Sequence, residues 1–185
     1  MVENRVKVKN NKLNEQIEQF KSSLSDIDKY EKAAVYNTDG TVFLKERAGT
    51  INEVIFTPNE YMQMRGKILV HSHINTGDLT DKILSPEDLF TAAYFGMKGI
   101  QAITKSSVSA FSPGIVLIGN TGMRNQFIND YENILYDGKK RVAALAENAK
   151  EIDKVIFQTA KKMSDYLKSN ERKYGYKYEE RGVFD

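Results

Sequence analysis

The sequence of 185 residues has no cysteine, only two histidines and no long apolar run. The missing cysteine excludes a disulfide framework, a thiolate zinc site and a cysteine nucleophile. No apolar run approaches the roughly 20 residues that cross a bilayer. The polar N-terminal stretch MVENRVKVKNNKLNEQ lacks the apolar core of a signal peptide. The net charge of +2 calls for no nucleic-acid or anionic-membrane partner. We therefore expect a cytoplasmic protein with neither partner.

Apolar spacing divides the chain into three parts. Residues 1–32 are polar, and the spacing of Leu13, Ile17, Phe20 and Leu24 predicts a short amphipathic helical arm. Residues 33–119 are mixed and form the expected core. Residues 120–185 are dominated by helical periodicity and form the expected helical extension.

The central part reads as alternating strands and helices. AAVYNTDGTVFL predicts a β-hairpin around Thr38, Asp39 and Gly40. Further strands are expected at INEVIFTP, GKILVHSH, GIQAITK and GIVLIG, with helical turns at NEYMQM and a helix at SPEDLFTAAYFGM. This order predicts an α+β (α/β-like) fold with a mixed β-sheet and flanking helices.

The last part predicts two helices. Apolar residues from Val142 to Leu167 recur every three or four positions, which predicts one long helix from about 139 to 170. A shorter helix that includes Phe127 is expected before it, with the turn at Asp137 and Gly138. The helices are a candidate surface for a protein partner. The tail ERKYGYKYEERGVFD could stack on bases or phosphates, but with so modest a net charge we expect a solvated or crystal-ordered tail.

Both histidines lie in the segment VHSH. Side chains alternate along a strand, so His71 and His73 point to one face, about 7 Å apart along the chain, and can bind one metal ion. Because cysteine and further histidines are absent, a third ligand must be Asp or Glu. Asp88 is the main candidate. Asp78 and Asp81 are alternative ligands or, as we favour, plain loop residues. Two histidines and one carboxylate leave a coordination position open for water, which is typical of catalytic zinc.

The segment SPED, residues 85–88, also has a purely structural interpretation. Ser85 stands at a helix N-cap position, Pro86 at the first helical position, and Asp88 three residues after the cap. Ser-x-x-acid is the capping box that begins many helices. The metal hypothesis therefore depends on the conjunction of this segment with the two histidines.

His-x-His followed by a loop and Ser-x-x-Asp resembles the signature of the JAB/MPN (JAMM) metalloproteases. The order of segments in AAVYNTDGTVFLKERAGTINEVIFTPNEYMQMRGKILVHSH is similar to the bacterial and phage branch, which includes JAB-like domains of phage head-morphogenesis proteins and toxins. The resemblance covers residues 33–119 and implies a cytidine-deaminase-like JAB/MPN core. The family glutamate would fall on Glu46, with Glu53 as the fallback.

Two features depart from the family pattern. Ile74 follows the second histidine where the family usually has proline. The spacer 74–84, INTGDLTDKIL, has eleven residues and is longer than usual. An insertion in a surface loop costs little free energy, but it changes access to the site.

The resemblance implies a zinc-dependent hydrolase that acts on peptide or isopeptide bonds of a protein or peptide substrate. Zn²⁺ held by His71, His73 and Asp88 would activate water, Glu46 would take its proton, and Ser85 would donate a hydrogen bond to the oxyanion. Glu46 has an alternative interpretation as a solvated charge on an edge strand.

Two other functions stay open at this point. One is a catalytically silent JAB-like structural or adaptor module, phage-encoded and docked through its helices. The other is a different metal-dependent hydrolase, such as a phosphoesterase, although that class commonly uses more histidines or aspartates than this chain offers.

Overall fold

The computed structural model describes residues 2–24, 29–74, 76–145 and 148–184. Within these ranges the elements follow in chain order: α1 (Val2–Ser22), β1 (Lys32–Tyr36), β2 (Val42–Ala48), α2 (Pro58–Gln63), β3 (Ile68–Ser72), α3 (Pro86–Tyr94), β4 (Gly99–Ile103), β5 (Val108–Ser112), α4 (Ile115–Gly119), α5 (Thr121–Ala143), α6 (Ala149–Tyr174) and β6 (Lys177–Arg181).

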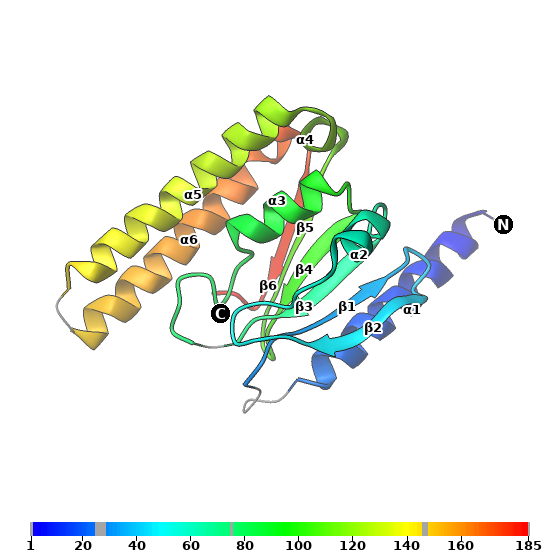
Figure 1. Ribbon diagram of the computed structural model, residues 1–185, viewed down its shortest axis with the longest axis horizontal. Helices are drawn as coiled ribbons and strands as arrows, with labels where there is room; N and C mark the ends of the chain where they lie inside the picture. Colours follow the sequence, from blue (N-terminus) through cyan, green and yellow to red (C-terminus); the bar gives the residue numbers. More distant parts are fainter. Residues whose placement is uncertain (1, 25–28, 75, 146–147, 185) are drawn as a thin grey trace.

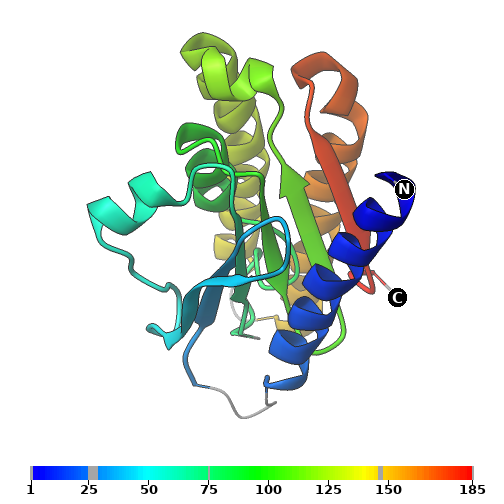
Figure 2. The same ribbon diagram turned by 90° about the vertical axis from the view of Figure 1, so that its right-hand side faces the viewer.

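The strands form one six-stranded sheet in the order β2-β1-β3-β4-β5-β6. β3 and β4 are parallel, and the other neighbours are antiparallel. Helices lie on both faces of this mixed sheet (Figures 1 and 2). The predicted α+β class with a mixed sheet and flanking helices is therefore confirmed.

Alternation along the strands separates two apolar layers. On one face, Leu69 and Ile100 of the central strands pack with buried residues of α3, α5 and α6, including Leu89 and Phe127. On the other face, Ile68, Val70 and Ile103 pack against Ile17 and Phe20 of α1. The predicted amphipathic arm is therefore confirmed as a helix that covers the second face of the sheet (Figure 2).

The predicted hairpin and two predicted strands are present. β1 and β2 are antiparallel neighbours, and Gly40 in the connecting turn has φ 82°, a left-handed conformation that favours glycine. The strands expected at GKILVHSH and GIQAITK are β3 and β4, and the helical turns expected at NEYMQM are α2.

The strand predicted at INEVIFTP is wrong. Residues 51–57 form a loop, which ends where Thr57 and Glu60 make the capping box of α2. Gly49 lets this loop fold back closely, because a Cβ there would lie 2.0 Å from the carbonyl oxygen of Glu53. β-branched residues favour a strand locally, but contacts with other parts of the chain override this preference here.

The strand predicted at GIVLIG is also wrong, because residues Ile115–Gly119 form the short helix α4. Leu117 is fully buried, whereas Ile115 is 86% exposed. A short apolar run does not distinguish a buried strand from a helical turn by its periodicity.

The single helix predicted from 139 to 170 is interrupted. α5 continues to Ala143 and α6 begins at Ala149. The turn predicted at Asp137 and Gly138 is wrong, because both residues lie inside α5. A Cβ on Gly138 would lie 2.4 Å from Cγ2 of Thr159 in α6, so this glycine allows two helices to approach closely.

Two strands were not predicted. β5 lies in SVSAFS, and β6 lies in the segment expected to be a solvated tail. Tyr176 and Tyr178 are buried, so the tail expectation is wrong for this segment. The division of the chain at residues 32 and 119 stays a prediction, although β6 joins the same sheet as β1. Among the described residues, the helices lack the length and apolar character required to span a bilayer.

Candidate metal centre

His71 and His73 reach one side of the sheet because of strand periodicity. His71 has the same parity in β3 as Leu69, which packs in the layer under α3. His73 follows two residues later, and its N–H donates to the carbonyl of Ile103 at 3.0 Å. Asp88 lies in the first turn of α3, close to the C-terminal end of the central strand β3.

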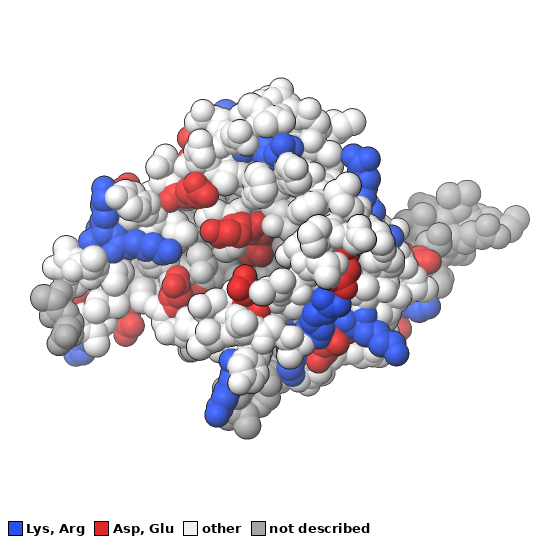
Figure 3. Space-filling model, in the orientation of Figure 1, with Lys and Arg blue, Asp and Glu red and all other residues white. Residues whose placement is uncertain are grey.

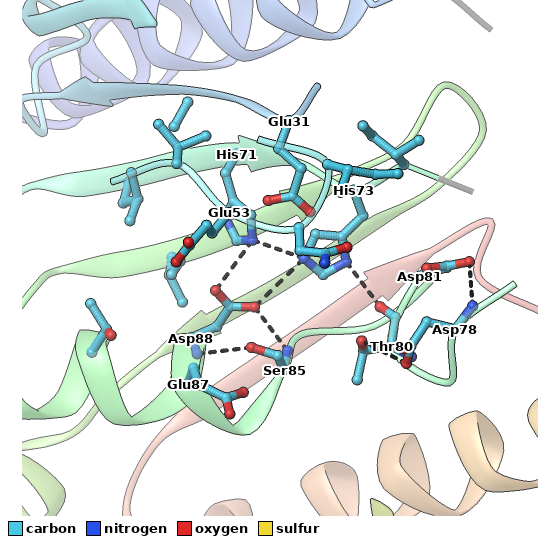
Figure 4. Close-up of a pocket in the computed structure, with 18 of the residues that line it drawn as sticks. Glu31, Glu53, His71, His73, Asp78, Thr80, Asp81, Ser85, Glu87 and Asp88 are labelled. Atoms are coloured by element: carbon cyan, nitrogen blue, oxygen red, sulfur yellow. Dashed lines mark hydrogen bonds and ion pairs between the residues drawn. The ribbon is translucent and has the colours of Figure 1, made fainter. Parts of the chain in front are cut away.

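The three side chains converge on one point (Figure 4). Nε2 of His71 and Nε2 of His73 are 2.9 Å apart. The two carboxylate oxygens of Asp88 lie 3.2 Å from Nε2 of His71 and 3.6 Å from Nε2 of His73. Two ligands bound to zinc at about 2.0–2.1 Å in a tetrahedral site are roughly 3.3 Å apart. The arrangement therefore matches a small tetrahedral ion, and it is the one such group of His, Asp or Glu among the described residues.

The hydrogen bond on the far side of His73 favours metal binding. Nδ1 of His73 lies 2.9 Å from the carbonyl oxygen of Thr80. A carbonyl oxygen can only accept, so Nδ1 carries a proton, and in the neutral imidazole Nε2 then presents its lone pair toward the point shared with Asp88 and His71. Nδ1 of His71 is buried without a hydrogen-bond partner among the described residues.

The charged groups of the cluster shift one another's pKa values toward the ionised forms. Burial alone would raise the pKa of the Asp88 carboxyl, but His71 and His73 hold it well below its ordinary value. Burial would lower the pKa of His73, but Asp88 and Glu31 raise it. Asp88 is therefore an ionised carboxylate, the form that binds a cation.

The structural interpretation of SPED is also confirmed. The Ser85 N–H donates to Oδ2 of Asp88 at 2.8 Å, and the Asp88 N–H donates to Oγ of Ser85 at 3.1 Å. This capping box fixes the Asp88 carboxylate as it begins α3. The same bonds leave the hydroxyl hydrogen of Ser85 free to donate, and Ser85 lines the adjacent cavity.

The described part of the spacer, residue 74 and residues 76–84, forms one wall of the site. Oδ2 of Asp81 accepts from the N–H groups of Thr76, Gly77 and Asp78 at 2.8, 2.6 and 2.9 Å, and Oδ1 accepts from the Thr76 hydroxyl at 3.0 Å. Asp78 accepts from the Thr80 N–H at 3.3 Å. Both alternative ligands therefore hold the loop, and the structure brings Asp88 to the imidazoles instead.

A cavity of about 330 Å³ opens beside the cluster. Its walls come from the loop 49–57, the spacer 74–84 and the first turns of α3 (Figure 4). His71, His73, Ser85 and Asp88 all line it. A pocket of this size accommodates a few side chains of a larger molecule.

Glu46 does not line this cavity. It lies exposed on β2, where its Oε2 accepts from the hydroxyl of Ser23 at 3.2 Å. Its charge also contributes to the raised pKa of Tyr36, after burial, and Tyr36 belongs to the layer under α1. Glu46 is therefore on the opposite face of the sheet from His71. Glu53, the fallback residue, does line the cavity from the loop 49–57.

Glu31 is a site residue that sequence reasoning missed. In the antiparallel pair of β1 and β3, Ala33 stands opposite His71, so the same register places Glu31 opposite His73. The residue is 8% exposed, lines the cavity, and points between the two imidazoles (Figure 4). Its parity with buried Ala33 and Val35 was the available signal.

The environment of Glu31 suits proton transfer. Burial raises the pKa of its carboxyl above the ordinary value; His73 and His71 act against this, and Asp88 and Asp81 add to it. Within the described part of the chain, the carboxylate accepts no hydrogen bond. A carboxylate whose pKa lies closer to neutrality is a better general base and acid.

Comparison with known proteins gives no identification. No family model matches the sequence, and the curated proteins and the solved structures also contain no match. Nothing in these comparisons identifies a JAB/MPN domain, so the resemblance depends on the motif residues alone.

Proposed function

We propose that this protein is a metal-dependent hydrolase that cleaves peptide or isopeptide bonds with activated water, on a JAB/MPN-like core. The observation that carries the proposal is the convergence of His71, His73 and Asp88 within 4.8 Å of one another beside a cavity. Two nitrogens and one carboxylate oxygen suit zinc and leave a position open. When bound, zinc supplies a Lewis acid that lowers the pKa of water from 15.7 to about 7.

The residues around the cavity transfer the proton, stabilise the oxyanion and orient the metal ligand His73. Glu31 takes a proton from the attacking water as its oxygen bonds to the carbonyl carbon. Glu31 then delivers that proton to the leaving nitrogen as the C–N bond breaks. The Ser85 hydroxyl donates to the oxygen that becomes negatively charged. Thr80 keeps His73 in the tautomer that binds metal.

We assign the base to Glu31 because it alone combines burial with a position between the imidazoles. Glu31 is 8% exposed, whereas Glu53 is exposed at the mouth and Glu46 lies on the other face. A base must be within reach of the proton it takes, and Glu46 fails this condition.

The first experiment is zinc analysis of protein purified without chelators or a histidine tag. We expect about one zinc per chain, lost in the double variant His71→Ala/His73→Ala. Circular dichroism of both proteins checks that the variant still folds. If the wild type contains no zinc and takes up none on titration, the proposal is wrong.

The second experiment separates the candidate bases. Glu31→Gln should keep zinc and lose hydrolysis of a peptide and isopeptide panel by about 100-fold or more. Glu46→Gln is the matched control and should keep both zinc and activity. Loss of activity in Glu46→Gln with full activity in Glu31→Gln would refute the assignment of the base.

A catalytically silent structural module is the second candidate. Its support is that Asp88 already serves as a helix cap and an ion-pair partner of both histidines. This alternative predicts no bound metal and a destabilised Asp88→Ala variant. A different metal-dependent hydrolase, such as a phosphoesterase, has less support, because that class commonly uses more ligands than the one group that the described residues supply.

A further inference from the structure

The charged side chains that line the cavity are all acidic. The lining carboxylates are Glu31, Glu53, Asp78, Asp81, Glu87 and Asp88. None of the described lining residues is Lys or Arg, although the whole chain has 27 basic residues against 25 acidic ones. Figure 3 shows acidic side chains gathered around a hollow near the centre of this face.

Only some of these carboxylates are used by the fold or by metal binding. The Asp81 carboxylate accepts four hydrogen bonds inside the spacer loop, and the Asp78 carboxylate accepts two from Thr80. Asp88 caps α3 and faces the imidazoles. The side-chain carboxylates of Glu53 and Glu87 have no hydrogen bond or ion pair within the described part of the chain, and both residues are exposed and line the cavity.

Glu31 supplies a second, independent observation that points to a ligand. It is more than nine-tenths buried, it points into the cavity, and its carboxylate lacks a hydrogen-bond donor among the described residues. A buried carboxylate without a donor costs free energy. A cationic or hydrogen-donating group that enters the cavity would reduce this cost.

We propose that the cavity selects peptides with lysine or arginine next to the bond that is cleaved. The carboxylates outnumber the two charges of a zinc ion, so the cavity stays negative when metal is bound. A negative, partly enclosed cavity attracts cations and repels acidic or phosphorylated segments. Glu53 lies on the loop 49–57 and Glu87 lies on the first turn of α3, so they line the cavity from two different walls (Figure 4). This inference rests on the proposed function.

The test compares three pools of fluorescent decapeptides. The pools share randomised neutral positions and differ at two fixed positions beside the centre, which are lysine, norleucine or glutamate. Binding to the zinc-treated protein of 185 residues is measured by anisotropy at low and high salt, and cleavage is measured by mass spectrometry. We expect the lysine pool to bind on the order of tenfold more tightly than the norleucine pool at low salt, with a smaller difference at high salt.

Charge removal at the mouth is the specific test. Glu53→Gln/Glu87→Gln should reduce the lysine preference on the order of tenfold. Glu132→Gln/Asp137→Asn removes two exposed acids of α5 outside the cavity lining and should leave the preference unchanged. Equal binding of the three pools, binding of none, or an equal loss in both double variants would overturn the inference.

The two proposals fail in different ways. Charge-selective binding without cleavage supports recognition of cationic peptides by the cavity and removes support from the hydrolase. Cleavage without preference for the lysine pool supports the hydrolase and overturns the inference.

Discussion

Hydrogen bonds to a single carboxylate, that of Glu60, strongly change its pKa. Glu60 closes the capping box of α2 by accepting from the Thr57 N–H at 2.8 Å, and it also pairs with Arg47, whose Nη1 donates at 3.1 Å. The Arg47 hydrogen bond, followed by that of Thr57, lowers the pKa of Glu60 to about 2. The ionised form is therefore favoured in the folded state.

This lowered pKa predicts a pH-dependent contribution to stability. A carboxyl whose pKa is depressed by folding stabilises the protein above its unfolded pKa, and loses this contribution as pH falls through the folded pKa. Wild type should therefore be more stable than Glu60→Gln at neutral pH. The difference should shrink from about pH 4.5 and vanish near pH 2. Urea unfolding across this range measures it, and Glu132→Gln, on the exposed surface of α5, should follow wild type. A gap that is independent of pH would contradict this account.

At the scale of elements, the spacer loop 74–84 orients the site from outside the metal ligands. Asp81 gathers three backbone N–H groups of the loop, and the adjacent Thr80 carbonyl accepts from Nδ1 of His73. Leu79, Ile83 and Leu84 anchor the loop in the protein interior. The insertion is therefore a folded wall of the cavity, and it helps to select the His73 tautomer.

Loss of the Asp81 carboxylate should weaken metal binding without removing a ligand. In Asp81→Ala the loop loses four hydrogen bonds, and the Thr80 carbonyl no longer holds His73. Loss of such outer partners typically reduces metal affinity by about 10- to 100-fold. Competition with a fluorescent zinc chelator measures the affinity. Lys82→Ala, an exposed position of the same loop, should bind zinc as wild type does. Wild-type affinity in Asp81→Ala would show that the loop does not orient His73.

At the scale of the whole molecule, the sheet joins segments that are far apart in the chain. β6 pairs with β5, and Tyr176 and Tyr178 bury their rings in the layer that holds α5 and α6. Tyr131 of α5 donates to the carbonyl of Leu84 at 2.8 Å, immediately before the Ser85 cap. The C-terminal third therefore supports the segment that presents Asp88.

Removal of residues 176–185 should therefore destabilise the whole fold, and not only its C-terminal segment. The truncation exposes the edge of β5 and deletes two buried tyrosines, and replacing one buried aromatic side chain by alanine typically costs about 3–5 kcal/mol. We expect the free energy of unfolding to fall by at least about 3 kcal/mol, as measured by urea denaturation. Lys177→Ala, which shortens an exposed side chain of β6, should cost little. A truncated chain that unfolds like wild type would show that the tail does not support the core.

The sequence by itself determined the parts of the site that depend on short-range geometry. The period of two along a strand puts His71 and His73 on one face, and the Ser-x-x-Asp spacing both caps α3 and presents Asp88. The helical arm and the first hairpin were predictable for the same reason, because their signals are local.

Only the tertiary structure decided which glutamate faces the histidines. A shift of one residue in strand register moves a side chain to the other face of the sheet. The spacing of residues within β1 and β2 does not determine this register. Glu31 therefore reaches the cavity, and Glu46 reaches the α1 side. Gly138 is a similar case, because a glycine that suggests a turn in sequence instead meets Thr159 of another helix. Contacts between segments far apart in the chain decide these positions, and no window of sequence contains both partners.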